Sequence, residues 1–482
     1  MLDIRAAEQL LDFSARIEGG QVRAREQLEG AVAIHNILER EQVAYLADEV
    51  GMGKTYVALG ALALFRHFNP TCRVLIIAPR ENIQRKWMKD YRNFVSYNVR
   101  YPDLRVKSID GRPTRRLAFC DDLVKLLRES ALDPDADFFC RLTSFSVAVS
   151  GTGALQPESI RAFRDRLRAE LPWLDDEVFD LRSKQAFKDN VARALCCALP
   201  TFDLVIIDEG HNLKHGFQER SAARNRVLGL CLGRDTGRVE KRLFPRYVVR
   251  ARRVLFLSAT PVEDTYRQLW NQLDVVGKST GFDAFLDDAV TEEEKKALAA
   301  RFLVRRVTKI RVGGQDLTKN LYRRLWRRGG VSSWDEPIVV KDPRQKLILA
   351  LVQKKVSEML QDEKFNSSFQ IGMLASFESF LETAKIKRLE EESTFDDAEQ
   401  TEDSLEREGI DVHAINRLAA SHRRHFGREL PHPKMDALVD CLSQSWESGR
   451  KTLVFVRRVA SVKELKRKLD ERYDEWLLER LN

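Results

Sequence analysis

A lysine and a threonine follow closely spaced glycines in ADEVGMGKTYVALGAL, residues 47–62. An apolar run precedes this stretch and a helical pattern follows it, which is the context of a phosphate-binding loop. Glycines allow the backbone to turn its N–H groups toward an anion at the helix N-terminus. Lys54 would reach the β- and γ-phosphates and Thr55 would place its hydroxyl on Mg²⁺. The alternative is a glycine-rich turn with a chance lysine. The stretch predicts a nucleotide site made by Gly51, Met52, Gly53, Lys54 and Thr55.

An acidic pair occurs downstream in LVIIDEGH, residues 204–211, at the end of another apolar run. Asp208 would hold Mg²⁺ through water, and Glu209 would orient and deprotonate an attacking water. Such a pair alone is commonly a solvated strand end. After a phosphate-binding loop, and with His211 next, it indicates nucleotide hydrolysis.

Near-continuous apolar runs at 43–47, 73–79, 202–209 and 253–261 are typical of buried parallel strands. They alternate with helix-like segments, which predicts an α/β fold with a parallel sheet. We expect helical insertions at about 150–200 and a mainly helical region at 276–430. Another apolar run, KTLVFVRR, follows much later at 451–458.

The bulk composition limits the class of protein. The chain has 482 residues, so we expect two or three domains. Its apolar runs are too short to cross a bilayer, and its first twenty residues lack the apolar core of a signal peptide. The seven cysteines form no CxxC pair, so we interpret them as reduced, mostly buried thiols. A cytoplasmic protein without a membrane partner is predicted.

The motifs DEVGMGKT, DEGHNLKH and LSATPVEDTYRQLWNQLD resemble motifs I, II and III of superfamily 2 helicases. They are similar to the Swi2/Snf2 branch, including the bacterial RapA/HepA-like ATPases, in which Asp48 is expected at the start of motif I. VLIIAPRENIQRKWMKD is similar to motif Ia with its tryptophan, Trp87, and 141–148 resembles motif Ib. The resemblance covers residues 23–275 in order, with a gap at 150–200. It implies two RecA-like lobes that hydrolyse ATP with Mg²⁺ and act on nucleic acid, mostly duplex DNA.

Further site residues follow from this resemblance. Gln27 matches the Q motif, whose amide reads adenine, although a lone helical glutamine is usually only solvated. Arg80 would contact a nucleic-acid phosphate or be a solvated loop residue. The hydroxyls of motif III would hydrogen-bond the acidic pair and couple hydrolysis to lobe movement, whereas the plain alternative is a polar turn after a strand; the residues of this motif here are Ser258, Ala259 and Thr260.

Charge is distributed unevenly. Residues 301–330 hold ten Arg and Lys against one Asp, and 389–411 is an acidic segment interpreted as a linker or exposed loop. The basic block has leucines at helical spacing, so it is either the solvated face of an amphipathic helix or a contact to duplex phosphates. The candidate contacts are Arg323, Arg324, Arg327 and Arg328.

We expect a first RecA-like lobe over 1–275, a linker or insertion region over 276–430, and the beginning of a second RecA-like lobe over 431–482. The last part resembles motif IV, but no motif V or VI follows, and motif VI carries the family's arginine finger. The expectation is therefore a fragment, a split protein whose partner polypeptide supplies the rest of the second lobe, or a degenerate ATPase.

The sequence predicts an ATP-dependent, DNA-directed translocase or helicase-like motor, or its N-terminal part. The alternative is a non-hydrolysing ATP-binding switch or DNA-binding scaffold. A kinase or GTPase is disfavoured because DEGH and SATP occur together and no NKxD-like base reader is found.

Overall fold

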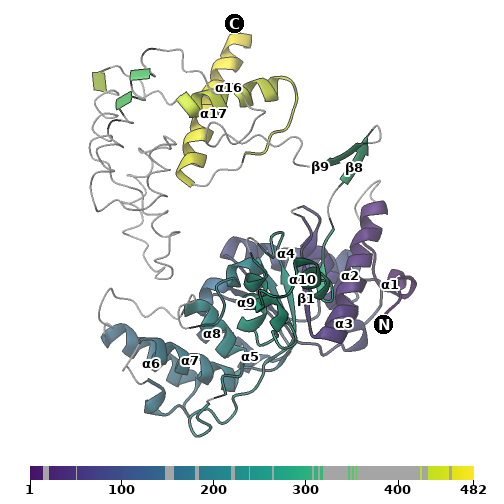
Figure 1. Ribbon diagram of the computed structural model, residues 1–482, viewed down its shortest axis with the longest axis vertical. Coiled ribbons are helices and arrows are strands. Elements are labelled where there is room, and N and C mark those ends of the chain that lie inside the picture. Colours follow the sequence, from purple (N-terminus) through teal and green to yellow (C-terminus); the bar gives the residue numbers. More distant parts are fainter. Residues whose placement is uncertain are drawn as a thin grey trace. The chain divides into compact units, whose positions relative to one another are not determined.

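The computed structural model divides into two compact units, Met1–Asp316 and Leu317–Asn482. Apart from isolated residues between 343 and 425, it describes residues 1–14, 21–49, 51–146, 157–179, 184–218, 223–237, 239–262, 265–306, 309–312, 315–318, 433–454 and 459–481. Figure 1 shows the chain with its elements labelled.

The first unit consists of strands and helices in alternation. Its strands are β1 (Val43–Leu46), β2 (Val74–Ala78), β3 (Leu117–Cys120), β4 (Asp137–Arg141), β5 (Phe202–Asp208), β6 (Ala251–Leu257), β7 (Leu303–Val304) and β8 (Lys309–Val312). Strand β9 (Gln315–Thr318) spans the boundary at Asp316. The helices of the first unit are α1 (Ile4–Leu10), α2 (Gln21–Glu41), α3 (Lys54–Phe68), α4 (Glu81–Asn98), α5 (Leu123–Leu132), α6 (Pro157–Glu170), α7 (Lys184–Ala198), α8 (Ala223–Cys231), α9 (Tyr266–Val275) and α10 (Glu292–Ala299). Short 3₁₀ turns lie at Leu142–Phe145, Asp176–Phe179, Gly210–Leu213 and Asp283–Leu286.

Seven strands form one sheet in the order β3-β4-β2-β5-β6-β1-β7. Every pairing in it is parallel, for example Val43 with Val254 and Leu75 with Val205. The predicted α/β fold with a parallel sheet is confirmed. β8 and β9 form a separate two-stranded sheet.

Alternate strand residues enter two different cores, because successive side chains of a strand point to opposite faces. In β2, Leu75 and Ile77 belong to one buried cluster, while Val74, Ile76 and Ala78 belong to the other. Helices α5 to α9 contribute to the first cluster and α1 to α4 to the second. Burial on both faces explains why these strands are nearly continuous apolar runs in sequence.

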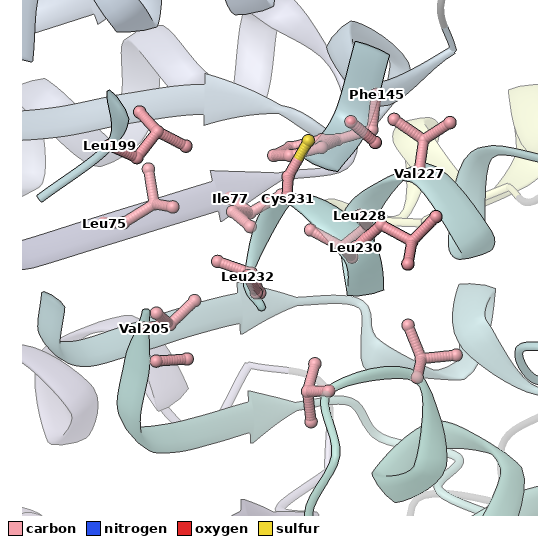
Figure 2. Packing of buried hydrophobic residues seen from close by; sticks show 14 of the residues in the cluster. Leu75, Ile77, Phe145, Leu199, Val205, Val227, Leu228, Leu230, Cys231 and Leu232 are labelled. Atoms are coloured by element: carbon pink, nitrogen blue, oxygen red, sulfur yellow. The ribbon is translucent and has the colours of Figure 1, made fainter. Parts of the chain in front are cut away.

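Figure 2 shows part of the first cluster, where helix α8 packs over the sheet. Leu228 and Leu230 from this helix lie in the same buried cluster as Leu75 and Val205 of the strands. This packing anchors β5, whose end carries the acidic pair.

Helix α3, which begins at the phosphate-loop lysine, is anchored by a buried ion pair. Arg66, near its C-terminal end, donates to Asp137 at the start of β4 and, at 3.2 Å, to the carbonyl oxygen of Cys72. Arg66 is 1% exposed and Asp137 is fully buried. The helix is therefore fixed to the sheet at the end opposite the loop.

Four of the five apolar runs predicted as strands correspond to β1, β2, β5 and β6, the fifth (451–458) is not a strand over its described residues 451–454, and the helical insertion corresponds to α6 and α7. We did not predict β3, β4 and β7. The predicted helical character of 301–318 was wrong, since its described residues include β7, β8 and β9. Of the leucines at helical spacing, Leu317 lies in β9, while the rest of the basic block, 319–330, lies outside the described residues.

The first unit continues past residue 275, the limit indicated by the motifs. Helix α10 and strand β7 follow, and β7 pairs with β1 through Tyr45–Leu303 and Leu46–Val304. In the second unit, α16 (Pro433–Glu447) and α17 (Val459–Leu481) pack through a small cluster of Leu438, Val439, Leu442 and Leu465. Residues 451–454 have no regular structure, and 455–458 lie outside the described residues, as does the acidic segment 389–411.

Six of the seven cysteines are buried, as predicted. Burial raises the pKa of the Cys72 and Cys196 thiols to about 11, which makes thiolate formation unfavourable at neutral pH. In the described part of the chain, no helix is long and apolar enough to cross a bilayer.

Candidate nucleotide-binding and hydrolysis site

The three motif-bearing segments follow neighbouring strands. β1 precedes the glycine-rich loop, β5 ends at Asp208 and β6 precedes Ser258, and the sheet order places β6 between β5 and β1. Because these strands are parallel, their carboxyl ends meet at one edge of the sheet, where ligands bind in open α/β folds. Burial raises the pKa of Asp208 and the contact with His211 lowers the pKa of Glu209; the ammonium of Lys54 is close enough to both carboxylates to favour their ionised forms. The loop and the acidic pair therefore form one site.

The loop adopts the conformation that its glycines permit. Gly51 and Gly53 have φ angles of +86° and +80°, a region that other residues rarely adopt. Helix α3 starts immediately afterwards, so its first N–H groups face the loop. Lys54 Nζ donates to the carbonyl oxygens of Asp48 at 2.9 Å and Glu49 at 3.3 Å. The loop therefore holds the ammonium at the start of the helix.

Gln27 on α2 contacts this loop directly. It is 7% exposed, and its Nε2 donates to the carbonyl oxygen of Met52 at 3.3 Å. A Cβ added to Gly53 would lie 2.1 Å from the same nitrogen, so a larger residue there would displace the amide. Gln27 and the glycine-rich loop are therefore packed directly against each other.

The acidic pair contains two carboxylates in different environments. Burial raises the pKa of Asp208, although the hydrogen bond from Trp87 opposes the shift. The contact with His211 lowers the pKa of Glu209, so its carboxylate stays ionised at neutral pH. Glu209 has φ +53° and ψ +52°, a left-handed conformation that is uncommon outside glycine. Strained backbone of this kind concentrates at functional sites.

Motif III reaches the acidic pair through a histidine. His211 Nδ1 lies 2.8 Å from Ser258 Oγ and 3.2 Å from Glu209 Oε2. The backbone N–H of Thr260 donates to Ser258 Oγ at 3.2 Å. We expected the motif III hydroxyls to contact the acidic pair themselves, but the described contact of Ser258 runs through His211. Its neighbour Ala259 is half-buried and Thr260 is exposed.

The oxygen atoms of the Thr55 and Asp208 side chains are of the kind that binds Mg²⁺. Among the described residues, no group of three or more His, Cys, Asp or Glu side chains is arranged to hold a metal ion. Mg²⁺ does not require such a cage, since it keeps several waters and commonly binds one or two carboxylates together with substrate phosphates. The Thr55 hydroxyl and the Asp208 carboxylate are oxygen donors of this kind.

Part of the chain is similar to a known protein family. Residues 16–151 match the protein-family model described as the type III restriction enzyme, res subunit. Residues 16–151 are therefore similar to this restriction-enzyme subunit family. This matched segment contains Gln27, Lys54 and Trp87, whereas Asp208 and Glu209 lie beyond it. No curated protein sequence matches the chain.

Three solved structures are similar to the chain at low sequence identity. The SWI2/SNF2 ATPase core of Sulfolobus solfataricus in complex with dsDNA is 14% identical, with 93% of this chain and 69% of that chain covered and a TM-score of 0.35. The SWI2/SNF2 ATPase core domain of the same organism is 12% identical, with 73% and 54% covered and a TM-score of 0.31. The Hef helicase domain of Pyrococcus furiosus is 14% identical, with 92% and 78% covered and a TM-score of 0.33.

Two residues of the first unit contact the site although the sequence did not predict that they would. Trp87 was recognised only as part of motif Ia, and Arg306 only as part of the basic block. Arg306 follows β7 and binds Asp48 through its backbone N–H at 2.8 Å and its Nε at 3.0 Å, and through Nη2. It also donates to the carbonyl oxygen of Glu26 on α2. Asp48 is fully buried, so Arg306 neutralises a carboxylate beside the phosphate loop.

Replacing Arg306 by alanine is expected to lower the free energy of unfolding by about 3–5 kcal/mol, the usual cost of leaving one charge of a buried pair uncompensated. The double variant Asp48→Ala/Arg306→Ala should be more stable than Arg306→Ala, because it removes the orphaned carboxylate as well. Urea denaturation measures both. If the loss of stability in the double variant equalled the sum of the losses in Asp48→Ala and Arg306→Ala, the two side chains would not be coupled.

The remaining predicted residues are Arg80 and four arginines of the basic block. Arg80 is exposed immediately before α4. The four arginines proposed as phosphate contacts lie outside the described residues; they are Arg323, Arg324, Arg327 and Arg328.

Proposed function

We propose that this protein is an ATP-hydrolysing, DNA-directed motor of the Swi2/Snf2 type. The observation that supports this most strongly is the meeting of Lys54, Glu209 and Ser258 at the carboxyl edge of three adjacent parallel strands. A nucleotide phosphate tail placed at the N-terminus of α3 would lie between the lysine and the acidic pair.

Each residue has a distinct role in this proposal. Loop N–H groups and Lys54 bind the β- and γ-phosphates, and Thr55 and Asp208 hold Mg²⁺, partly through water. The metal ion, when bound, neutralises charge on the phosphates. Glu209 orients the attacking water and accepts its proton, while His211 holds the Glu209 carboxylate. Gln27, on α2 beside the loop, contacts the adenine in this proposal.

Motif III has the coupling role. Ser258 contacts His211, and His211 contacts Glu209. Loss of the γ-phosphate would therefore change the contacts of Ser258 at the end of β6. The rival function, a non-hydrolysing switch, uses the same binding residues without turnover. Release of phosphate that increases on addition of duplex DNA distinguishes them. ATP binding without DNA-stimulated phosphate release would favour the switch.

DNA binding is proposed from the charge of residues 301–330 and from the double-stranded DNA in the similar Sulfolobus structure. Each phosphate neutralised by Lys or Arg contributes about 0.9 to the slope of log affinity against log salt. Four arginines are to be replaced by glutamate: Arg323, Arg324, Arg327 and Arg328. The slope is expected to flatten by about one unit for each phosphate contact that is lost.

A charge-matched control distinguishes contact from general electrostatic attraction. Reversing four exposed arginines of the first unit changes the net charge equally and should leave the slope nearly unchanged; they are Arg5, Arg23, Arg92 and Arg161. If the basic-block variant and the control variant flattened the salt slope equally, the basic block would be a solvated surface and not a DNA contact. Fluorescence anisotropy of a labelled duplex at several salt concentrations measures both slopes.

A further inference from the structure

The indole of Trp87 makes a contact that core packing alone does not require. Trp87 lies on α4, is 1% exposed and packs in the same cluster as Tyr91 and Phe94. Its Nε1 donates to Asp208 Oδ2 at 2.8 Å, across a separation of 121 residues in the chain. Buried indole N–H groups need an acceptor, but many backbone carbonyls would serve. Here the acceptor is the carboxylate at the end of β5.

The two oxygens of Asp208 are held by different donors. Oδ2 accepts from Trp87, and Oδ1 accepts from the backbone N–H of Glu209 at 3.0 Å. Two fixed donors, one on each oxygen, prevent rotation of a carboxylate whose terminal torsion is otherwise broad. Each oxygen has a further lone pair, so the orientation is set without using up the capacity to accept from water or to bind a cation.

The identity of the orienting groups matters for a divalent cation. Mg²⁺ demands near-ideal octahedral geometry, so a carboxylate that rotates freely binds it, or its waters, less well. Partners that orient a ligand from outside commonly change metal affinity by about 10–100-fold when they are removed. The indole is one such partner, since it is rigid, buried and anchored in the α4 core.

We propose that Trp87 is a positioning residue for the divalent cation: its indole N–H fixes the Asp208 carboxylate in the orientation that receives Mg²⁺ with the nucleotide. This inference rests on the proposed function of Asp208. It predicts a defect in Mg²⁺ dependence, whereas a purely structural tryptophan predicts only a loss of stability.

Trp87→Phe removes the donor and keeps an aromatic ring. The Mg²⁺ concentration that gives half-maximal binding of a fluorescent ATP analogue is expected to rise about 10–100-fold. Binding of the same analogue in EDTA should equal that of the wild type, because the loop and Lys54 are unchanged. Equilibrium binding is the readout, so hydrolysis is not needed for the test.

The matched control is Tyr91→Phe on the same helix. Tyr91 is also a buried aromatic residue, and its hydroxyl contacts Arg66 instead of Asp208. It should lose stability without a shift in the Mg²⁺ midpoint. If Trp87→Phe does not fold, benzothienylalanine at position 87, which has the shape of tryptophan without the N–H, provides the same test.

The outcomes separate this inference from the function on which it rests. Wild-type protein that binds the analogue with no Mg²⁺ dependence would overturn both. A Mg²⁺-dependent wild type with an unchanged midpoint in the position-87 variants would overturn the positioning role alone. Equal midpoint shifts in those variants and in Tyr91→Phe would also overturn it, because packing of α4 would then be the cause.

Discussion

Lys54→Ala is expected to weaken ATP binding by about 30-fold or more. The ammonium lies at the start of α3, held by the carbonyl oxygens of Asp48 and Glu49, where the phosphates are proposed to bind. Losing one partner of a desolvated, hydrogen-bonded charge pair typically costs about 2–5 kcal/mol, and about 1.4 kcal/mol corresponds to a tenfold change in affinity. Isothermal titration calorimetry with MgATP measures the change.

The control for this variant is Lys89→Ala, which removes an exposed lysine from α4. It should bind MgATP as the wild type does. Circular dichroism establishes that both variants are folded before their affinities are compared. Equal ATP affinity in Lys54→Ala and wild type would falsify the assignment of the loop as a phosphate site.

Glu209→Gln is expected to keep ATP binding and lower the rate of hydrolysis by about 10²–10⁴-fold, the usual contribution of a general base. The amide preserves the size of the side chain but cannot accept a proton at neutral pH. The contact with His211 holds the pKa of Glu209 below its ordinary value, so the native group is the ionised carboxylate that this role needs. Single-turnover phosphate release under saturating ATP and DNA separates chemistry from binding.

Glu293→Gln, an exposed glutamate on α10, makes the same chemical change away from the site and should leave turnover unaltered. If Glu209→Gln retained the wild-type rate of DNA-stimulated hydrolysis, the general base would have to be another group. If Glu209→Gln lost ATP binding as well, Glu209 would be needed for the structure of the site.

The sequence by itself determined the principal elements and the chemistry of the site. The runs that became β1, β2, β5 and β6 are apolar at consecutive positions because both faces of this sheet are covered by helices. The phosphate-loop spacing determined where α3 begins, since the left-handed glycines and the helix N-terminus are local features. Local patterns of this kind are readable without knowledge of distant residues.

Weak or misleading local patterns account for the elements that the sequence did not reveal. β3 has only four residues with alternating burial, and β7 has two, so neither has enough length for a periodicity. Leu317 has helical spacing to later leucines, yet it lies in β9. Strand pairing competes with helical spacing in such short segments, and tertiary contacts decide the outcome.

Only the tertiary structure decided which residues support the motifs. The sheet order places β6 between β5 and β1, which brings Ser258 and His211 together. Trp87 meets Asp208 across 121 residues, and Arg306 meets Asp48 across 258. A buried tryptophan or an arginine in a basic run has the same local pattern whichever acceptor it contacts. The choice of acceptor depends on how the strands and helices pack, and this leaves no periodicity in the chain.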